Sequence, residues 1–107
     1  MNPTRNDYPA HASRAAYFAI WENNARRRDG RAPAGTRIGW ARARQLANRR
    51  PISLATIRRT NSYLKRARVF NSGDWNDKGT ISYHLWGGDS MLLWTEKILN
   101  EYDRRTK

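Results

Sequence analysis

Residues 51–69 read PISLATIRRTNSYLKRARV, and they predict the best-defined helix of the chain. Pro51 disfavours helical geometry at the residue before it, and Ser53 is a good N-cap. Ile52 and Ile57 occupy the two positions of a hydrophobic staple, which fixes how the chain enters a helix. We therefore expect a helix that begins after Ser53 and runs to about residue 69. Its apolar face consists of Leu54, Ile57, Leu64 and Ala67.

The opposite face of this helix is basic. Placing successive residues at intervals of about 100° brings five polar side chains together, away from the apolar face. They are Arg58, Arg59, Ser62, Lys65 and Arg66. We expect this face to contact phosphate groups. The alternative interpretation is a basic face that meets only solvent.

A second helix is predicted just before this one. Thr36 has the side chain of an N-cap, and the helix is expected to run to about residue 48. Its apolar face holds Trp40, Ala43, Leu46 and Ala47, and outside that face lie Arg42, Arg44, Gln45, Asn48 and Arg49. Residues 49–52 join the two helices, so the pair resembles a helix-turn-helix, although an αα-corner has the same pattern. Because Pro51 stiffens the turn, we do not expect specific base readout.

The rest of the chain completes a helical domain. Residues 1–11 predict a flexible arm, and residues 12–28 a helix with Tyr17, Phe18, Trp21 and Ala25 on its apolar face. Residues 80–86 fit a strand or a short helix, and we favour the helix because Gly87 and Gly88 would end it. Asp89 is expected to cap a last helix to about residue 104, and residues 105–107 to fray. The predicted fold is all-α: one domain over residues 12–104, a compact bundle of four or five short helices with a helix-turn-helix-like pair.

Composition points to an anionic partner. The 107 residues carry 21 Lys and Arg against 9 Asp and Glu, a net charge of +12 at pH 7, and Arg supplies most of the cations. Arg binds phosphate and carboxylate bidentately, so nucleic acid is the first hypothesis. A second basic cluster supports it, since five cations exceed what a helix end needs for its dipole. This cluster comprises Arg26, Arg27, Arg28, Arg31 and Arg37.

Composition also excludes several classes. The chain has no Cys, which removes disulfide scaffolds, cysteine-based zinc sites, iron–sulfur clusters and thiol catalysis. No apolar run approaches the ~20 residues of a membrane span, and the N-terminus lacks the apolar centre of a signal peptide. We therefore expect no membrane partner and no secretion by a signal peptide. Twelve aromatic residues, five of them Trp, argue against disorder throughout.

Catalysis has little support in the sequence. His11 and His84 are far apart, and Asp74, Asp77 and Asp89 occupy loop or cap positions that explain them structurally. We expect no enzyme, no catalytic residue, no metal and no cofactor.

The tryptophans are expected to serve mainly in packing. Trp21, Trp40, Trp86 and Trp94 lie on apolar stripes, so we expect them in the core. Trp75 lies in a polar loop, where it would either stack on a base or anchor the loop on the core. We favour the anchor.

Several blocks in order resemble a small module of tailed-bacteriophage proteins. They are GWARARQLAN at 39–48, PIS at 51–53, TIRR at 56–59, SYL at 62–64, Trp75, KGTI at 78–81, LWGGD at 85–89 and Trp94, together spanning roughly residues 36–95. The resemblance implies a phage or prophage origin, because such modules occur alone or attached to head-assembly and maturation proteins. This chain departs from the pattern at Thr60 and Asn61, where a Met is common, and in its strongly basic charge.

We therefore expect a small basic phage-type protein of the host cytoplasm or the virion that binds DNA or RNA mainly through phosphates. Two alternatives are a virion assembly component that binds acidic capsid or portal surfaces, and an inhibitor of a host nucleic-acid enzyme. The predicted nucleic-acid contacts are Arg26, Arg27, Arg28, Arg31, Arg37, Arg42, Arg49, Arg50, Arg58, Arg59, Ser62, Lys65 and Arg66.

Overall fold

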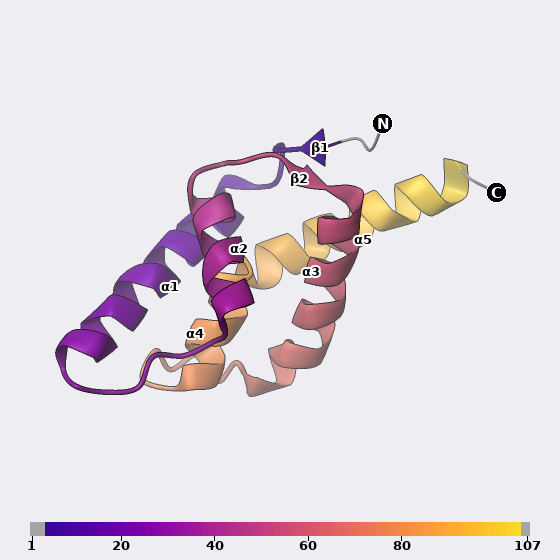
Figure 1. Cartoon of the computed structure of the whole chain (residues 1–107). Helices are drawn as coiled ribbons and strands as arrows, with labels where there is room; N and C mark the ends of the chain where they lie inside the picture. Colours follow the sequence, from indigo (N-terminus) through magenta and orange to yellow (C-terminus); the bar gives the residue numbers. More distant parts are fainter. Residues whose placement is uncertain (1–3, 106–107) are drawn as a thin grey trace.

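Helices supply nearly all the regular structure in the computed structural model, which describes residues 4–105 (Figure 1). They are α1 (Ala10–Arg28), α2 (Arg37–Ala47), α3 (Leu54–Ala67), the 3₁₀ helix η1 (Arg68–Phe70), α4 (Lys78–Leu85) and α5 (Gly88–Arg105). The prediction of an all-α bundle of four or five helices is confirmed, and the segment after residue 77 is the predicted short helix rather than a strand.

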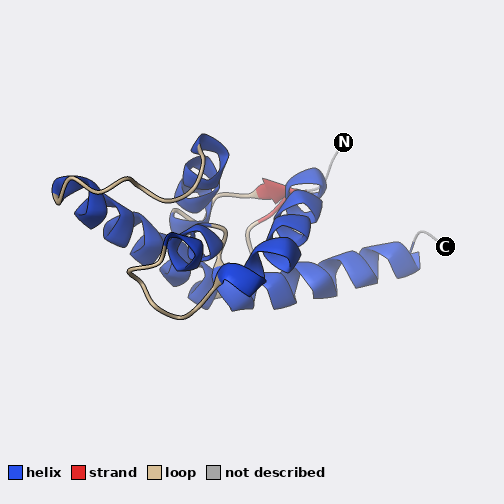
Figure 2. Ribbon diagram, turned by 90° about the horizontal axis from the view of Figure 1, so that it is seen from below, coloured by secondary structure: helices blue, strands red, loops and turns tan. Residues whose placement is uncertain are grey.

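The helices pack around α1 and α5. α1 packs against α2, α4 and α5, while α3 packs mainly against α5. Figure 2 shows the C-terminal part of α5 extending beyond the rest of the bundle. α2 packs mainly on α1, and α3 packs mainly on α5. The predicted helix-turn-helix-like pair is therefore present only as two consecutive helices joined by a short connection.

The N-terminal segment is packed against this connection. β1 (Thr4–Arg5) pairs antiparallel with β2 (Ile52–Ser53). Tyr8 is only 1% exposed, and its hydroxyl donates a hydrogen bond to the carbonyl of Arg50 at 2.8 Å. The prediction of a flexible arm is therefore wrong for residues 4–11, and its residues 1–3 lie outside the described residues. Of the predicted frayed tail, Arg105 ends α5 and residues 106–107 lie outside the described residues as well.

Two of the three predicted N-caps, Thr36 and Ser53, are confirmed. The Thr36 hydroxyl accepts a hydrogen bond from the Gly39 amide, and the Ser53 hydroxyl accepts one from the Thr56 amide, each at 3.2 Å. Each bond satisfies an amide of the first turn that has no partner within the helix. Local sequence therefore fixes where α2 and α3 begin.

Gly87 makes the tight turn between α4 and α5. Its φ of +104° lies in the left-handed region, and a Cβ there would stand 2.5 Å from the Met91 Cβ. A residue with a side chain would be strained and would clash. α5 then begins at Gly88, so Asp89 lies in its first turn rather than at the expected cap, and its carboxylate accepts a hydrogen bond from the Tyr83 hydroxyl.

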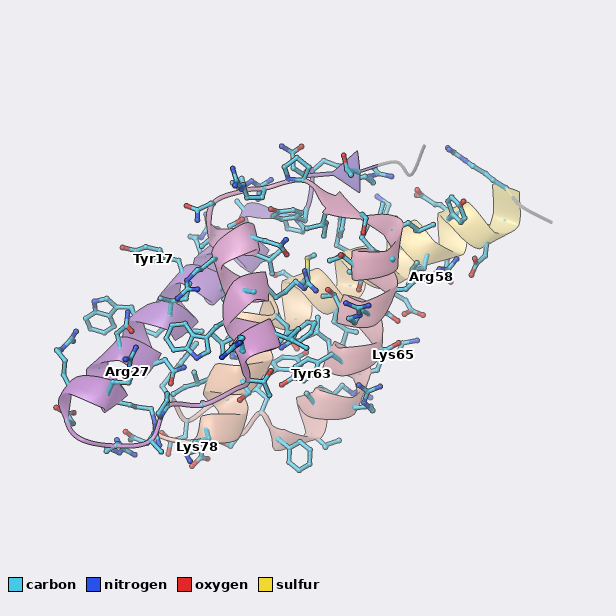
Figure 3. The ribbon with its side chains drawn as sticks, in the orientation of Figure 1. Tyr17, Arg27, Arg58, Tyr63, Lys65 and Lys78 are labelled. Atoms are coloured by element: carbon cyan, nitrogen blue, oxygen red, sulfur yellow. The ribbon has the colours of Figure 1, made fainter. Side chains whose placement is uncertain are left out.

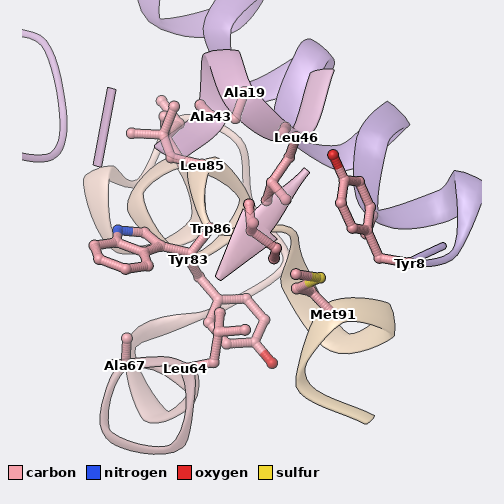
Figure 4. Close-up of a cluster of buried hydrophobic side chains, with 14 of the residues drawn as sticks. Tyr8, Ala19, Ala43, Leu46, Leu64, Ala67, Tyr83, Leu85, Trp86 and Met91 are labelled. Atoms are coloured by element: carbon pink, nitrogen blue, oxygen red, sulfur yellow. The ribbon is translucent and has the colours of Figure 1, made fainter. Parts of the chain in front are cut away.

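The core lies where α1, α2, α3, α4 and α5 meet, and Figure 4 shows Leu46, Leu64, Leu85 and Met91 in it, all of them fully buried. Trp86 is also buried, as predicted, and Trp40 and Trp94 are half-buried.

The buried face of α1 differs from the predicted one. Ala12, Ala16 and Ala19 are fully buried, whereas Tyr17, Phe18 and Trp21 are 66%, 43% and 52% exposed. The prediction of a core face made of these aromatic residues, with Trp21 in the core, is wrong. Small side chains let α2, α4 and α5 approach α1 closely, and this close packing decides which face is buried.

Candidate nucleic-acid interface

Arg26 has a structural role rather than the predicted nucleic-acid contact. Its side chain is 8% exposed at the end of α1. Its Nε donates a hydrogen bond to the Ala32 carbonyl at 3.1 Å, and its Nη1 donates to the Asn76 carbonyl at 2.9 Å. Arg26 therefore joins the C-terminal end of α1 to the two loops that follow α1 and precede α4.

Arg49 also supports the fold. It follows the C-cap of α2 with a φ of +55°, a conformation that favours glycine. Its guanidinium donates to the Tyr8 carbonyl at 2.6 Å and to the Ser13 hydroxyl at 2.8 Å, and it lies over the Tyr8 ring. These contacts hold the N-terminal segment in place, so Arg49 is not a free phosphate ligand either.

The predicted basic face of α3 divides into two edges. On the edge toward α5, Arg58 pairs with Asp103 at 3.2 Å and Lys65 pairs with Glu96 at 3.0 Å. Hydrogen bonds from Asn61 and Lys65 lower the pKa of Glu96. Figure 3 shows Arg58 and Lys65 on the side of α3 that faces away from α2. The positive charge of this edge is therefore balanced within the protein.

The other edge of α3 faces α2 across two aromatic rings. The ring of Tyr63 stacks on Trp86 with centroids 4.3 Å apart, and Tyr63 lies between the two helices in Figure 3. The guanidinium of Arg42, on α2, lies 5.3 Å from the Trp86 ring. Gly39 lets Trp86 approach α2 closely, since a Cβ there would stand 3.1 Å from the indole nitrogen.

Arg42 carries an uncompensated charge in this position. It is 6% exposed, although the helical pattern predicts it outside the apolar face, and its Nε has no hydrogen-bond partner among the described residues. Its Nη1 donates to the Gln45 side chain. Burial lowers the pKa of Arg42, and the positive charge of Arg59 lowers it further. Such a buried charge is normally paired with an opposite charge, which no described residue supplies here.

No acidic side chain lies on either of the two helices. α2 and α3 contain no Asp or Glu, and Arg59 and Arg66 have no carboxylate partner within residues 4–105. Burial raises the pKa of Tyr63, while a hydrogen bond with Ser82 and the charge of Arg66 act in the opposite direction. Arg42 on α2 and Arg59 on α3 therefore lie close enough to repel each other, and neither helix has a carboxylate to offset them.

A polar hollow continues this basic surface at the C-terminal end of α2. It has a volume of about 410 Å³ and is lined by Arg44, Gln45, Asn48 and Arg50. Gln45 lines the hollow and also contacts Arg42, because its side chain accepts the hydrogen bond from Arg42. We call the combined set the α2–α3 arginine cluster: Arg42, Arg44, Arg50, Arg59 and Arg66.

Arg44 is the member of this cluster that is absent from the predicted contacts. It is exposed, and its guanidinium lies over the Trp40 ring at 5.6 Å. The sequence signal that could have identified Arg44 is its position outside the apolar face of α2, one helical turn before Asn48 and on the same side of the helix.

The remaining predicted cations lie at the end of α1, in the loop that follows and, for Arg37, at the first residue of α2. Arg27, Arg28 and Arg37 are exposed, without a carboxylate partner among residues 4–105. Arg31 is also exposed, and its Nη2 lies 3.5 Å from the Asn76 carbonyl. Ser62 is exposed on α3, near the boundary between its two edges.

Trp75 anchors its loop, as favoured from the sequence. Its ring meets Phe18 edge-on with centroids 4.7 Å apart, and it lies 4.6 Å from the His84 ring. His84 is itself hydrogen-bonded to the Thr80 carbonyl at 2.7 Å.

Nowhere in residues 4–105 do three or more His, Cys, Asp or Glu side chains gather as they would around a metal ion. No helix in the same range has the length and apolar character needed to cross a membrane.

Comparisons with known proteins found no family model, curated protein or solved structure that matches the chain. The resemblance to the phage module stays a prediction.

Proposed function

We propose that the protein binds nucleic acid through the phosphate backbone, at the α2–α3 arginine cluster. The observation that carries this proposal is the uncompensated charge between the two helices. Arg42 is buried beside Arg59, its Nε lacks a partner among the described residues, and neither helix bears a carboxylate.

A phosphate group would relieve this arrangement. Its oxygens accept several hydrogen bonds at once, and its negative charge would offset the repulsion between Arg42 and Arg59. Phosphates repeat along a nucleic-acid strand, so one strand would supply ligands to Arg59 and Arg66 and to the hollow at Arg44 and Arg50. Such contacts are independent of base sequence, which agrees with the expected absence of specific base readout.

Salt dependence and backbone charge test the proposal. We expect binding to a DNA oligonucleotide, measured by fluorescence anisotropy, to weaken by roughly two to three orders of magnitude between about 50 and 200 mM salt. This follows if the five arginines each meet a phosphate, because the log–log slope is about −0.9 per contact. A peptide nucleic acid of the same base sequence, which has an uncharged backbone, should not bind.

Two results would count against the proposal. Equal affinity for the uncharged analogue would show that phosphates are not the ligand. Equal affinity for a polyglutamate of the same charge would instead favour an acidic protein surface, as the assembly hypothesis requires.

A further inference from the structure

An aromatic stripe lies on the solvent side of α1, where the sequence predicts a core face. Tyr17 and Trp21 are more than half exposed, and Figure 3 shows Tyr17 pointing away from the bundle. Phe18 stacks on Trp21 with centroids 6.0 Å apart and meets Trp75 edge-on. Phe18 is therefore held in place by Trp75 of the anchored loop, while the rings of Tyr17 and Trp21 are exposed to solvent.

Arginines stand at both ends of this stripe. Arg14 and Arg28 are each seven residues from Trp21, which places them on the same face of the helix and about 10 Å away along its axis. Arg14 donates a hydrogen bond to His11 at 3.0 Å, and Arg28 has no carboxylate partner within residues 4–105. Glu22 is the acidic residue of α1, and it lies about 100° around the helix from Trp21.

We infer that this stripe is a stacking platform for unpaired bases, so that the favoured ligand is a single-stranded nucleic acid. The inference rests on the proposed function and gives it a substrate class. Exposed rings accept any base because every base has an aromatic face, and the flanking arginines contact the phosphates on either side. In a duplex the base faces are covered by neighbouring base pairs, so the platform adds little there.

The charge around the rings is what identifies the occupant. An aromatic surface that docks a protein has few charges at its centre and a mixed polar rim. Here the exposed rings lie between two cations on one helix face, Arg14 and Arg28, so bases that stack on the rings would have positive charge on both sides for their phosphates.

The test compares single strands with duplexes. We expect the double variant Tyr17→Ala, Trp21→Ala to bind a single-stranded oligonucleotide about thirtyfold more weakly, since stacking on each of the two rings is worth about fivefold or more. Its affinity for a hairpin duplex of the same length should stay within about twofold of wild type. The conservative variant Trp21→Phe keeps a ring and should retain most of the single-strand affinity.

A matched control uses exposed apolar residues elsewhere. Val69 and Leu93 are 75% and 72% exposed, so Val69→Ala with Leu93→Ala removes exposed apolar side chains without removing a ring, and it should leave both affinities unchanged.

The outcomes separate this inference from the proposed function. If wild type binds neither ligand at low salt, both are overturned. If wild type binds and the Tyr17, Trp21 variant binds single strands equally well, only the platform is overturned. A wild-type dimer in sedimentation that this variant converts to monomer, with unchanged affinity, would likewise overturn it in favour of a self-association surface.

Discussion

The double variant Arg59→Ala, Arg66→Ala is expected to bind a DNA oligonucleotide about a hundredfold more weakly than wild type. Both residues lie about 100° around α3 from Arg58 and Lys65, on the side where Arg59 acts on Arg42 and Arg66 on Tyr63. Neither has a carboxylate partner within residues 4–105. Each hydrogen bond to a charged group contributes about 1.5–3 kcal/mol, which corresponds to tenfold or more in affinity. The salt slope, measured by anisotropy titrations at several salt concentrations, should decrease by about two.

The matched control removes the same charge from the same helix. Arg58→Ala with Lys65→Ala changes the edge that faces α5, where Asp103 and Glu96 already balance the two cations. We expect this variant to lose only the general electrostatic attraction and to keep nearly the wild-type slope. If the two double variants weakened binding equally, the assignment to one edge would be wrong, and net charge alone would explain the binding.

The replacement Asn23→Leu is expected to destabilise the fold by about 3 kcal/mol. Asn23 is fully buried on α1, where its side chain forms two hydrogen bonds with the backbone of Ala34, at 2.9 Å and 2.7 Å. Ala34 is itself buried, so leucine would leave its amide and carbonyl groups without partners at about 1–3 kcal/mol each. Urea unfolding, followed by far-ultraviolet circular dichroism, measures the change.

The neighbouring residue provides the control for this prediction. Asn24 is half-buried on the same helix, and its side chain forms no hydrogen bond with residues 4–105. Asn24→Leu should therefore change stability by no more than about 0.5 kcal/mol. Equal effects of the two leucines would mean that the bonds to Ala34 do not stabilise the loop before α2.

Features of the fold that depend on local chemistry are predictable from the sequence. Thr36 and Ser53 cap their helices through amides only three residues away, and Gly87 provides a turn that needs positive φ. Each of these signals acts within a few residues, so no knowledge of the distant chain is needed to interpret it.

The misassigned face of α1 shows where local pattern fails. Periodicity selects the most apolar residues, which here are Tyr17, Phe18 and Trp21. Burial is decided instead by three other helices, whose close approach admits only small side chains such as Ala16 and Ala19. The prediction for the N-terminal segment is wrong for a similar reason, since the Tyr8 hydroxyl donates a hydrogen bond to the carbonyl of Arg50, which is far along the chain.

The sequence predicts the kind of ligand that the candidate site binds better than it predicts which arginines form the site. The excess of arginine predicts an anionic partner, but the partner of each arginine depends on tertiary contacts. Arg26 and Arg49 bind backbone carbonyls, and Arg58 pairs with a carboxylate 45 residues away. The repulsion between Arg42 and Arg59 becomes visible only when α2 and α3 are placed together.

The most direct test of the phosphate site follows individual guanidinium groups. Proton–nitrogen correlation NMR resolves the Nε–H signals of arginines, and a short single-stranded oligonucleotide is added stepwise. We expect the signals of Arg42, Arg59 and Arg66 to move, while that of Arg26 stays because its Nε is already bonded to the Ala32 carbonyl. Movement of the Arg58 signal with no change at Arg42, Arg59 and Arg66 would show that phosphate does not bind at the α2–α3 arginine cluster.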